Sequence, residues 1–156
     1  MEFIDVELKV LIECLKKKEK ALCQIVNITE NQGFVLESEA SHDEKYAFFM
    51  QMNKEKQDAI NIVLQCDDVF ENVLQKIGPV LDANPSMYGT QVKTLQDMIR
   101  IVMDLDVRIR VGEDKNNKIL AEALDKVQAT EKPEAIDGGE YGSHKIIEAY
   151  KNQSMH

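Results

Sequence analysis

Apolar residues recur at alternating spacings of three and four between Glu44 and about Leu81. Because an α-helix turns once every 3.6 residues, this spacing places them on one side of a long helix. These positions are Phe48, Met52, Ala59, Ile62, Cys66, Val69, Val73 and Ile77. Further apolar residues beside them widen that side, so we expect this helix to contact two neighbours. This second group is Phe49, Ile60, Val63, Phe70, Leu74 and Leu81.

A similar rhythm predicts a first helix from about Phe3 to Glu37. Its core positions are Ile4, Leu8, Leu11, Leu15, Leu22 and Ile25. Lys18 falls at one further core position of the same series. The polar stretch 37–44 then breaks the pattern, and Ser41 followed by Glu44 is a candidate capping box for the second helix. Gly78 and Pro79 predict that the second helix kinks or ends there, because proline lacks the amide hydrogen.

A third helix is predicted from near Ser86 or Thr90 to about Gln128. Its core positions are Val92, Leu95, Ile99, Val102, Ile109, Leu120 and Val127. Between Asp106 and Lys118 polar residues and Gly112 take the places where apolar residues are expected. Glycine costs about 1 kcal/mol in a helix interior relative to alanine. The pattern therefore predicts that the bundle frays or kinks in this stretch.

The fold class that follows is all-α, an elongated antiparallel bundle of three long, coiled-coil-like helices over residues 1–129. Residues 130–156 are predicted to form a flexible tail, because they hold Pro133, three glycines and few apolar residues. Within the tail Ile146, Ile147, Ala149 and Tyr150 form a short amphipathic cluster. Such a segment either docks on its own bundle or binds another molecule. The pattern leaves a monomer and an antiparallel homodimer equally open.

Charge and cysteine content indicate which partners and which cellular compartment to expect. The net charge of −9 argues against a nucleic-acid partner, because phosphates are neutralised by clustered Lys and Arg. Cys14, Cys23 and Cys66 form no CxxC pair, which favours structural thiols in a reducing compartment. The first residues are acidic, and no apolar run approaches the roughly 18 residues of a membrane span. We therefore expect a cytoplasmic protein without membrane insertion.

The sequence offers few candidate catalytic or metal-binding residues. His42 stands among acidic residues, but their spacing matches no metal-ligand motif, and a solvated linker is the better interpretation. The adjacent Asp67 and Asp68 cannot face each other across a substrate, so solvated or interhelical ion-pair roles are favoured. No phosphate-binding loop, nucleophile elbow or zinc-protease motif occurs in the sequence. The sequence thus predicts no enzyme, no metal site and no cofactor.

Three stretches of the chain resemble a known family. These are LIECLKKKEKAL, MNKEKQDAINIVLQCDDVFENVLQKI and LQDMIRIVMDLDVRIRVGEDKNNKI, together with Glu113, Asn117 and Lys118 in the third. Over residues 8 to about 120 the chain resembles the helical flagellar export chaperones of the FlgN and FliT type, particularly the versions of clostridia-like bacteria. This resemblance implies a cytosolic chaperone that holds a late flagellar structural protein of hook-associated type unpolymerised before type III export, with the export apparatus as a further partner.

The resemblance also places client binding in the later helices and the C-terminal region. On this chain the implied client-binding residues are Met98, Val102, Met103, Ile109, Ile146, Ile147 and Tyr150. We expect the first four to line a groove and the last three to cover it or to join the client. The alternative function is a structural or regulatory coiled-coil protein that acts by self-association; an enzyme, the third alternative, would need a bound metal or cofactor.

Overall fold

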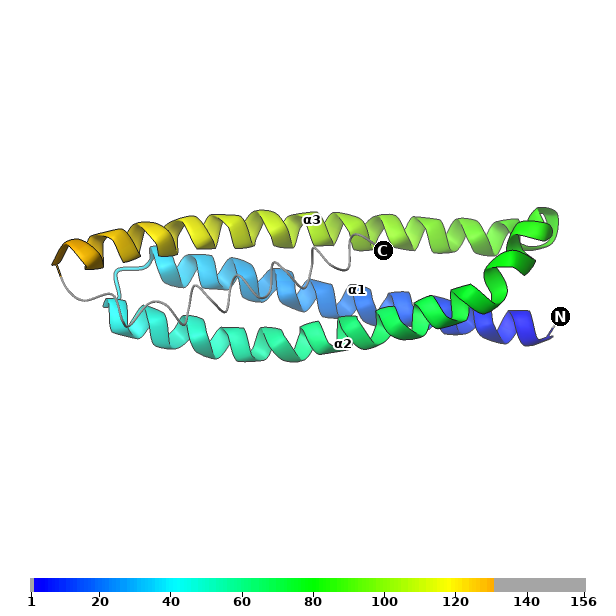
Figure 1. Ribbon diagram of the computed structural model, residues 1–156, viewed down its shortest axis with the longest axis horizontal. Coiled ribbons are helices and arrows are strands. Elements are labelled where there is room, and N and C mark those ends of the chain that lie inside the picture. The colour runs from blue at the N-terminus through cyan, green and yellow to red at the C-terminus, as the bar shows by residue number, and fades with distance from the viewer. Residues whose placement is uncertain (1, 131–156) are drawn as a thin grey trace. The chain divides into compact units, whose positions relative to one another are not determined.

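A computed structural model describes residues 2–130, with side chains described for residues 3–126. The fold is all-α, and no strand occurs within the described backbone. Helix α1 spans Glu2–Glu37, α2 spans His42–Ala83 and α3 spans Pro85–Thr130 (Figure 1). The predicted tail and its residues Ile146, Ile147 and Tyr150 lie outside the described residues.

The chain divides into two compact units, each built from a piece of every helix. Among the described residues, unit 1 comprises Glu2–Cys23 and Ala59–Leu105, and unit 2 comprises Gln24–Asp58 and Asp106–Thr130. Within each unit α2 runs antiparallel to α1 and α3 (Figure 1). The antiparallel three-helix arrangement predicted from the sequence is confirmed in each of them.

Local sequence explains where the helices end. Ser41 precedes α2, and its Oγ accepts a hydrogen bond from the backbone N of Glu44 at 3.3 Å, as the predicted cap requires. Asn84 alone separates α2 from α3. Its side-chain amide donates to the carbonyl of Val80 at 2.8 Å, and its own carbonyl accepts from the backbone N of Met87 and of Tyr88. Pro85 then occupies the first position of α3, where its missing N–H leaves no bond unmade.

Helix α2 does not end at Gly78–Pro79 but continues through Pro79 to Ala83. Proline removes one hydrogen bond of the helix without preventing the next turn from forming. Figure 1 shows the last turns of α2 deflected from the direction of the turns before them. Of the two outcomes that the sequence predicted at this position, a kink is the one observed.

The core of unit 1 is apolar and follows a seven-residue repeat. Helix α1 contributes all of its predicted core residues that fall in this unit, and Tyr88, Leu95 and Val102 of α3 lie seven residues apart. Lys18, at the remaining core position of α1, donates a hydrogen bond to Asp67 Oδ1 of α2 at 2.6 Å. The interhelical ion-pair role considered for Asp67 is thereby confirmed.

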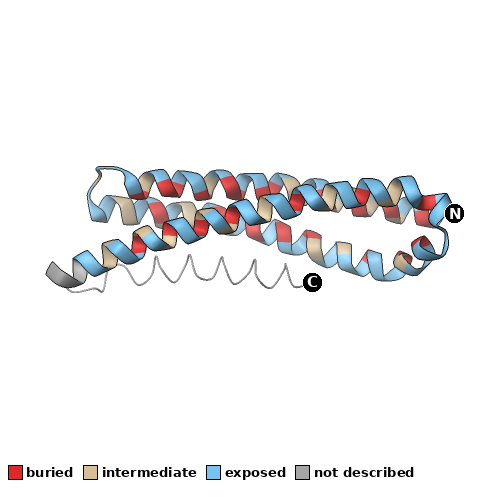
Figure 2. Ribbon diagram, turned by 90° about the horizontal axis from the view of Figure 1, so that it is seen from above, coloured by how far each residue is buried: buried red, intermediate tan, exposed pale blue. Residues whose placement is uncertain are grey.

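The predicted core side of α2 was partly wrong. Phe48, Ile62 and Val69 are exposed, whereas Phe49, Lys56 and Val63, again seven residues apart, are buried. Ala59, Cys66, Val73 and Ile77 of the predicted series are buried as expected, and the second predicted group contains Phe49 and Val63. Figure 2 shows the buried positions as a stripe along each helix.

Of the two outcomes predicted between Asp106 and Lys118, a frayed or a kinked third helix, the fraying was wrong. Helix α3 is continuous through this stretch. Glu113 and Asn116 are fully buried and hydrogen-bonded to other helices, and Gly112 packs against Thr29. The polar residues therefore belong to the interior of unit 2.

Candidate binding site

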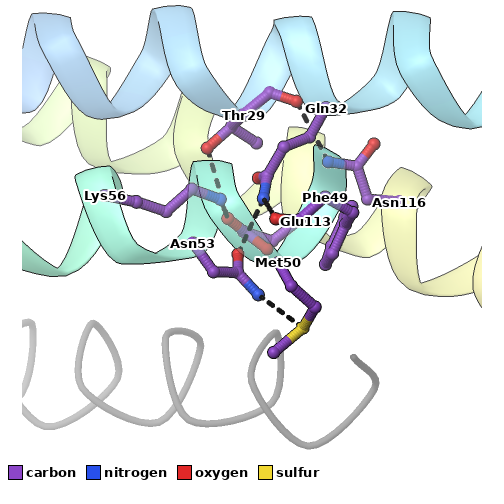
Figure 3. A network of polar contacts seen from close by, with 8 residues as sticks. All are labelled: Thr29, Gln32, Phe49, Met50, Asn53, Lys56, Glu113 and Asn116. Atoms are coloured by element: carbon purple, nitrogen blue, oxygen red, sulfur yellow. Dashed lines mark hydrogen bonds and ion pairs between the residues drawn. The ribbon is translucent and has the colours of Figure 1, made fainter. Parts of the chain in front are cut away.

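Five polar or charged side chains are buried among the described residues, and all of them lie in unit 2. They are Thr29 and Gln32 of α1, Lys56 of α2, and Glu113 and Asn116 of α3. Figure 3 shows these side chains converging from the three helices. We call this group the polar layer.

An ion pair between Lys56 and Glu113 forms the centre of the polar layer. Lys56 Nζ donates to Glu113 Oε1, and both side chains are fully buried. Thr29 Oγ1 donates to the same carboxylate oxygen at 3.2 Å. Burial lowers the pKa of Lys56 from its ordinary value, and the nearby carboxylate of Glu113 opposes this only in part. Because no face of the pair meets solvent, a substrate cannot reach it in the folded conformation.

Gln32 links the polar layer to the backbone of α2. Its Nε2 donates to the carbonyl of Phe49 at 3.2 Å and to Asn53 Oδ1 at 2.7 Å. Gln32 Oε1 and Glu113 Oε2 are buried and accept no hydrogen bond from the described residues. Buried acceptors without donors are destabilising. The layer is therefore well connected but not fully satisfied.

Two glycines let α1 and α3 approach closely beside the polar layer. A Cβ added to Gly112 would lie 2.8 Å from Thr29 Cγ2, and one added to Gly33 would lie 3.0 Å from Asn116 Oδ1. Asn116 Nδ2 also donates to the carbonyl of Thr29 at 3.0 Å. Each glycine thus receives a side chain of the opposite helix, and a larger residue at position 112 would push the two helices apart.

A small hollow of about 120 Å³ lies between α1 and α3 at this point. It is lined by Thr29, Glu30, Gly33, Phe34, Gly112, Lys115 and Asn116. Phe34 is 70% exposed, the largest exposed fraction among the large apolar side chains described. Two ion pairs bridge α1 and α3 here: Arg108 with Glu30 at 2.7 Å, and Lys115 with Glu37 at 3.3 Å. The hollow has room for about one apolar side chain and carries both signs of charge beside it.

The residues that the resemblance assigned to client binding lie in different units and differ in solvent exposure. Met98, Val102 and Met103 belong to unit 1, and Ile109 belongs to unit 2. Met103 is 60% exposed and Met98 is half-buried. Val102 and Ile109 are buried core residues and line no open groove. A client-binding role for any of them stays a prediction.

Lys56 and the hollow were not found from the sequence. The spacing of seven residues from Phe49 to Lys56 and on to Val63 was the available signal for the lysine, but a charged residue is rarely fully buried unless it is paired. Its partner Glu113 is 57 residues away. Nothing local in the sequence indicates that pairing.

Other kinds of site receive no support from the described residues. In that part of the chain no group of three His, Cys, Asp or Glu side chains lies close enough to hold a metal ion. None of the described helices is both long and apolar enough to cross a membrane. The three cysteines are free thiols, and burial raises the pKa of Cys66.

No family model, curated protein or solved structure matches this chain.

Proposed function

We propose that the chain is a cytosolic export chaperone that binds a late flagellar structural protein of hook-associated type and keeps it unpolymerised until type III export. The proposal rests on the resemblance of residues 8 to about 120 to the FlgN and FliT type. The structural observation that supports it best is the exposed Phe34 beside a hollow sized for one apolar side chain. The export apparatus is the second partner in this proposal.

Helix-in-groove binding is the mode that fits such a surface. An amphipathic client helix inserts one apolar anchor between α1 and α3, where the hollow is, and packs a second apolar side chain on Phe34. The neighbouring Arg108, Glu30, Lys115 and Glu37 accommodate the polar side chains that flank the anchor. Affinity then comes from burying apolar surface, and no nucleotide or metal is needed.

Each unit also carries exposed apolar side chains outside the hollow. In unit 2 they include Val107 and Val111, and in unit 1 they include Met103, Val69 and Ile101. Large exposed apolar side chains mark interaction surfaces when they cluster. Because a second copy of the chain would also cover them, self-association as a structural or regulatory coiled-coil protein is the second candidate function.

Calorimetric titration of the purified chain with a purified hook-associated protein tests the proposal. We expect a one-to-one complex, weakened at least about ten-fold by Phe34→Ser, which corresponds to about 1.4 kcal/mol. Phe48→Ser is the matched control, because Phe48 is also exposed in unit 2 but does not line the hollow. The client proposal fails if no complex forms at micromolar concentration while light scattering detects a stable homo-oligomer. Equal weakening by both variants would remove the hollow from the proposal.

A further inference from the structure

The two units have chemically different interiors. Among the described side chains of unit 1, every buried one is apolar apart from the hydroxyl of Tyr88. Unit 2 buries the whole polar layer described above, and its apolar interior is correspondingly small. That interior comprises Ile25, Val26, Leu36, Phe49, Ile109 and Leu120.

Contact with water offsets more of the free energy of opening in unit 2 than in unit 1. Lys56 and Glu113 lose their hydration on folding, and the attraction between buried charges repays that loss only in part. Gln32 Oε1 and Glu113 Oε2 have no donor among the described residues when the unit is closed, and water supplies donors when it opens. The apolar side chains of unit 1 gain nothing comparable from contact with water.

We propose that unit 2 opens on its own while unit 1 stays folded. The polar layer lowers the free energy that this opening requires. Opening hydrates Lys56, Glu113 and Gln32. It also exposes the cluster of Leu36, Phe49 and Leu120, which is otherwise packed between the three helices. Local opening of this kind is expected where buried apolar contacts are few and buried polar groups are many.

The polar layer also directs closure. Lys56 reaches Glu113 only in the alignment of α2 and α3 in which the two residues lie opposite each other. A shift of α2 by seven residues would place Phe49 or Val63 against Glu113 and break this pair. The pair therefore favours the observed alignment when unit 2 closes, as buried polar groups in coiled coils specify alignment at the expense of stability.

Hydrogen exchange of the full-length chain without any client tests the opening. We expect the slowest amides of residues 24–37, 42–58 and 106–126 to exchange at least ten-fold faster than the slowest amides of unit 1. Replacing the ion pair by Lys56→Met with Glu113→Leu should slow exchange in unit 2 at least ten-fold and leave unit 1 unchanged. Equal exchange in both units of the wild-type chain, or equal slowing of both by the double variant, would overturn the proposal.

Two further variants make this test specific. Lys56→Gln with Glu113→Gln removes both charges, keeps polar side chains and should also slow exchange in unit 2, so the test does not depend on the apolar variant folding. Lys18→Met with Asp67→Leu removes the ion pair of unit 1 and should leave exchange in unit 2 unchanged. A change in unit 2 from this control would show that the chain opens as a whole. Normal opening without client binding would count against the proposed function and not against the opening.

Discussion

Lys56 of α2 donates a hydrogen bond to Glu113 of α3 with both side chains excluded from solvent. Removing one partner of such a pair leaves the other charge buried and uncompensated. We expect Glu113→Leu alone to lower the free energy of unfolding by about 3–5 kcal/mol. Lys56→Met with Glu113→Leu should instead match the wild type or exceed it by about 1–4 kcal/mol. Urea unfolding of the wild type, the two single variants and the double variant measures both changes in the free energy of unfolding. Additive losses in the double variant would contradict the assignment of the pair.

The lowered pKa of Lys56 gives the stability a characteristic dependence on pH. Below the lowered pKa both the folded and the unfolded chain carry the proton, and the full penalty of burying the ammonium is present. Between that pKa and the ordinary value of 10.5 the unfolded chain binds more protons at this site, so the contribution of Lys56 to stability rises with pH.

The double variant Lys56→Met with Glu113→Leu lacks this titration and serves as the reference. We expect its advantage over the wild type in free energy of unfolding to shrink as the pH is raised from about 7 towards 10.5. Urea unfolding of both proteins at each pH measures the difference. An advantage that stays constant or grows over this range would show that the folded chain does not lower the pKa of Lys56.

Gly112 and Thr29 offer a steric test of the close approach of α1 and α3. The Cβ of Gly112→Ala would meet Thr29 Cγ2 at 2.8 Å, so we expect a loss of about 1–3 kcal/mol despite the better helix propensity of alanine. Adding Thr29→Ser removes that methyl group, keeps the hydroxyl and should restore most of the loss. Thermal unfolding measures all three proteins.

Gly89→Ala is the control for that experiment. No atom lies within 4 Å of a Cβ added at Gly89, so helix propensity alone applies, and we expect a gain of up to about 1 kcal/mol. If Gly112→Ala stabilised the chain as much as Gly89→Ala does, the two helices would be farther apart than described.

Asp67 and Asp68 are neighbours in sequence with different surroundings. Asp67 accepts the hydrogen bond of Lys18, and these two side chains are 30% and 17% exposed. We expect Asp67→Asn to lower the free energy of unfolding by about 1–2 kcal/mol, because a bond between charged groups is lost at a partly shielded site. Asp68 is exposed, and Asp68→Asn should change stability by less than about 0.5 kcal/mol. Chemical denaturation distinguishes the two, and equal effects would contradict the role of Asp67.

The sequence predicted the three helices because their apolar periodicity extends over many turns. Every predicted core residue of α1 is buried, from Ile4 to Ile25. It missed the core positions of Lys56 on α2 and Glu113 on α3 for one shared reason. Lys56 and Glu113 are polar at core positions, and each is stable there only because the other lies opposite. A periodicity argument treats one helix at a time and cannot detect such compensation.

The candidate site was harder to predict than the fold. Phe34 lies beyond the predicted core positions of α1, and its wide exposure was not predicted. The hollow beside it depends on Gly33 and Gly112 facing the opposite helix, a relation between positions far apart in the sequence. Val102 and Ile109 were selected for client binding by resemblance, and both are core residues. Exposure is a property of the packed helices, and apolar character alone does not reveal it.

The buried ion pair also constrains how this sequence can diverge. An apolar residue at either position is favourable only after the other has changed, so each single substitution passes through a destabilised chain. Marginally stable proteins tolerate few losses of that size. In descendants of this chain we therefore expect Lys56 and Glu113 to be replaced together or retained together, although they lie on two different helices.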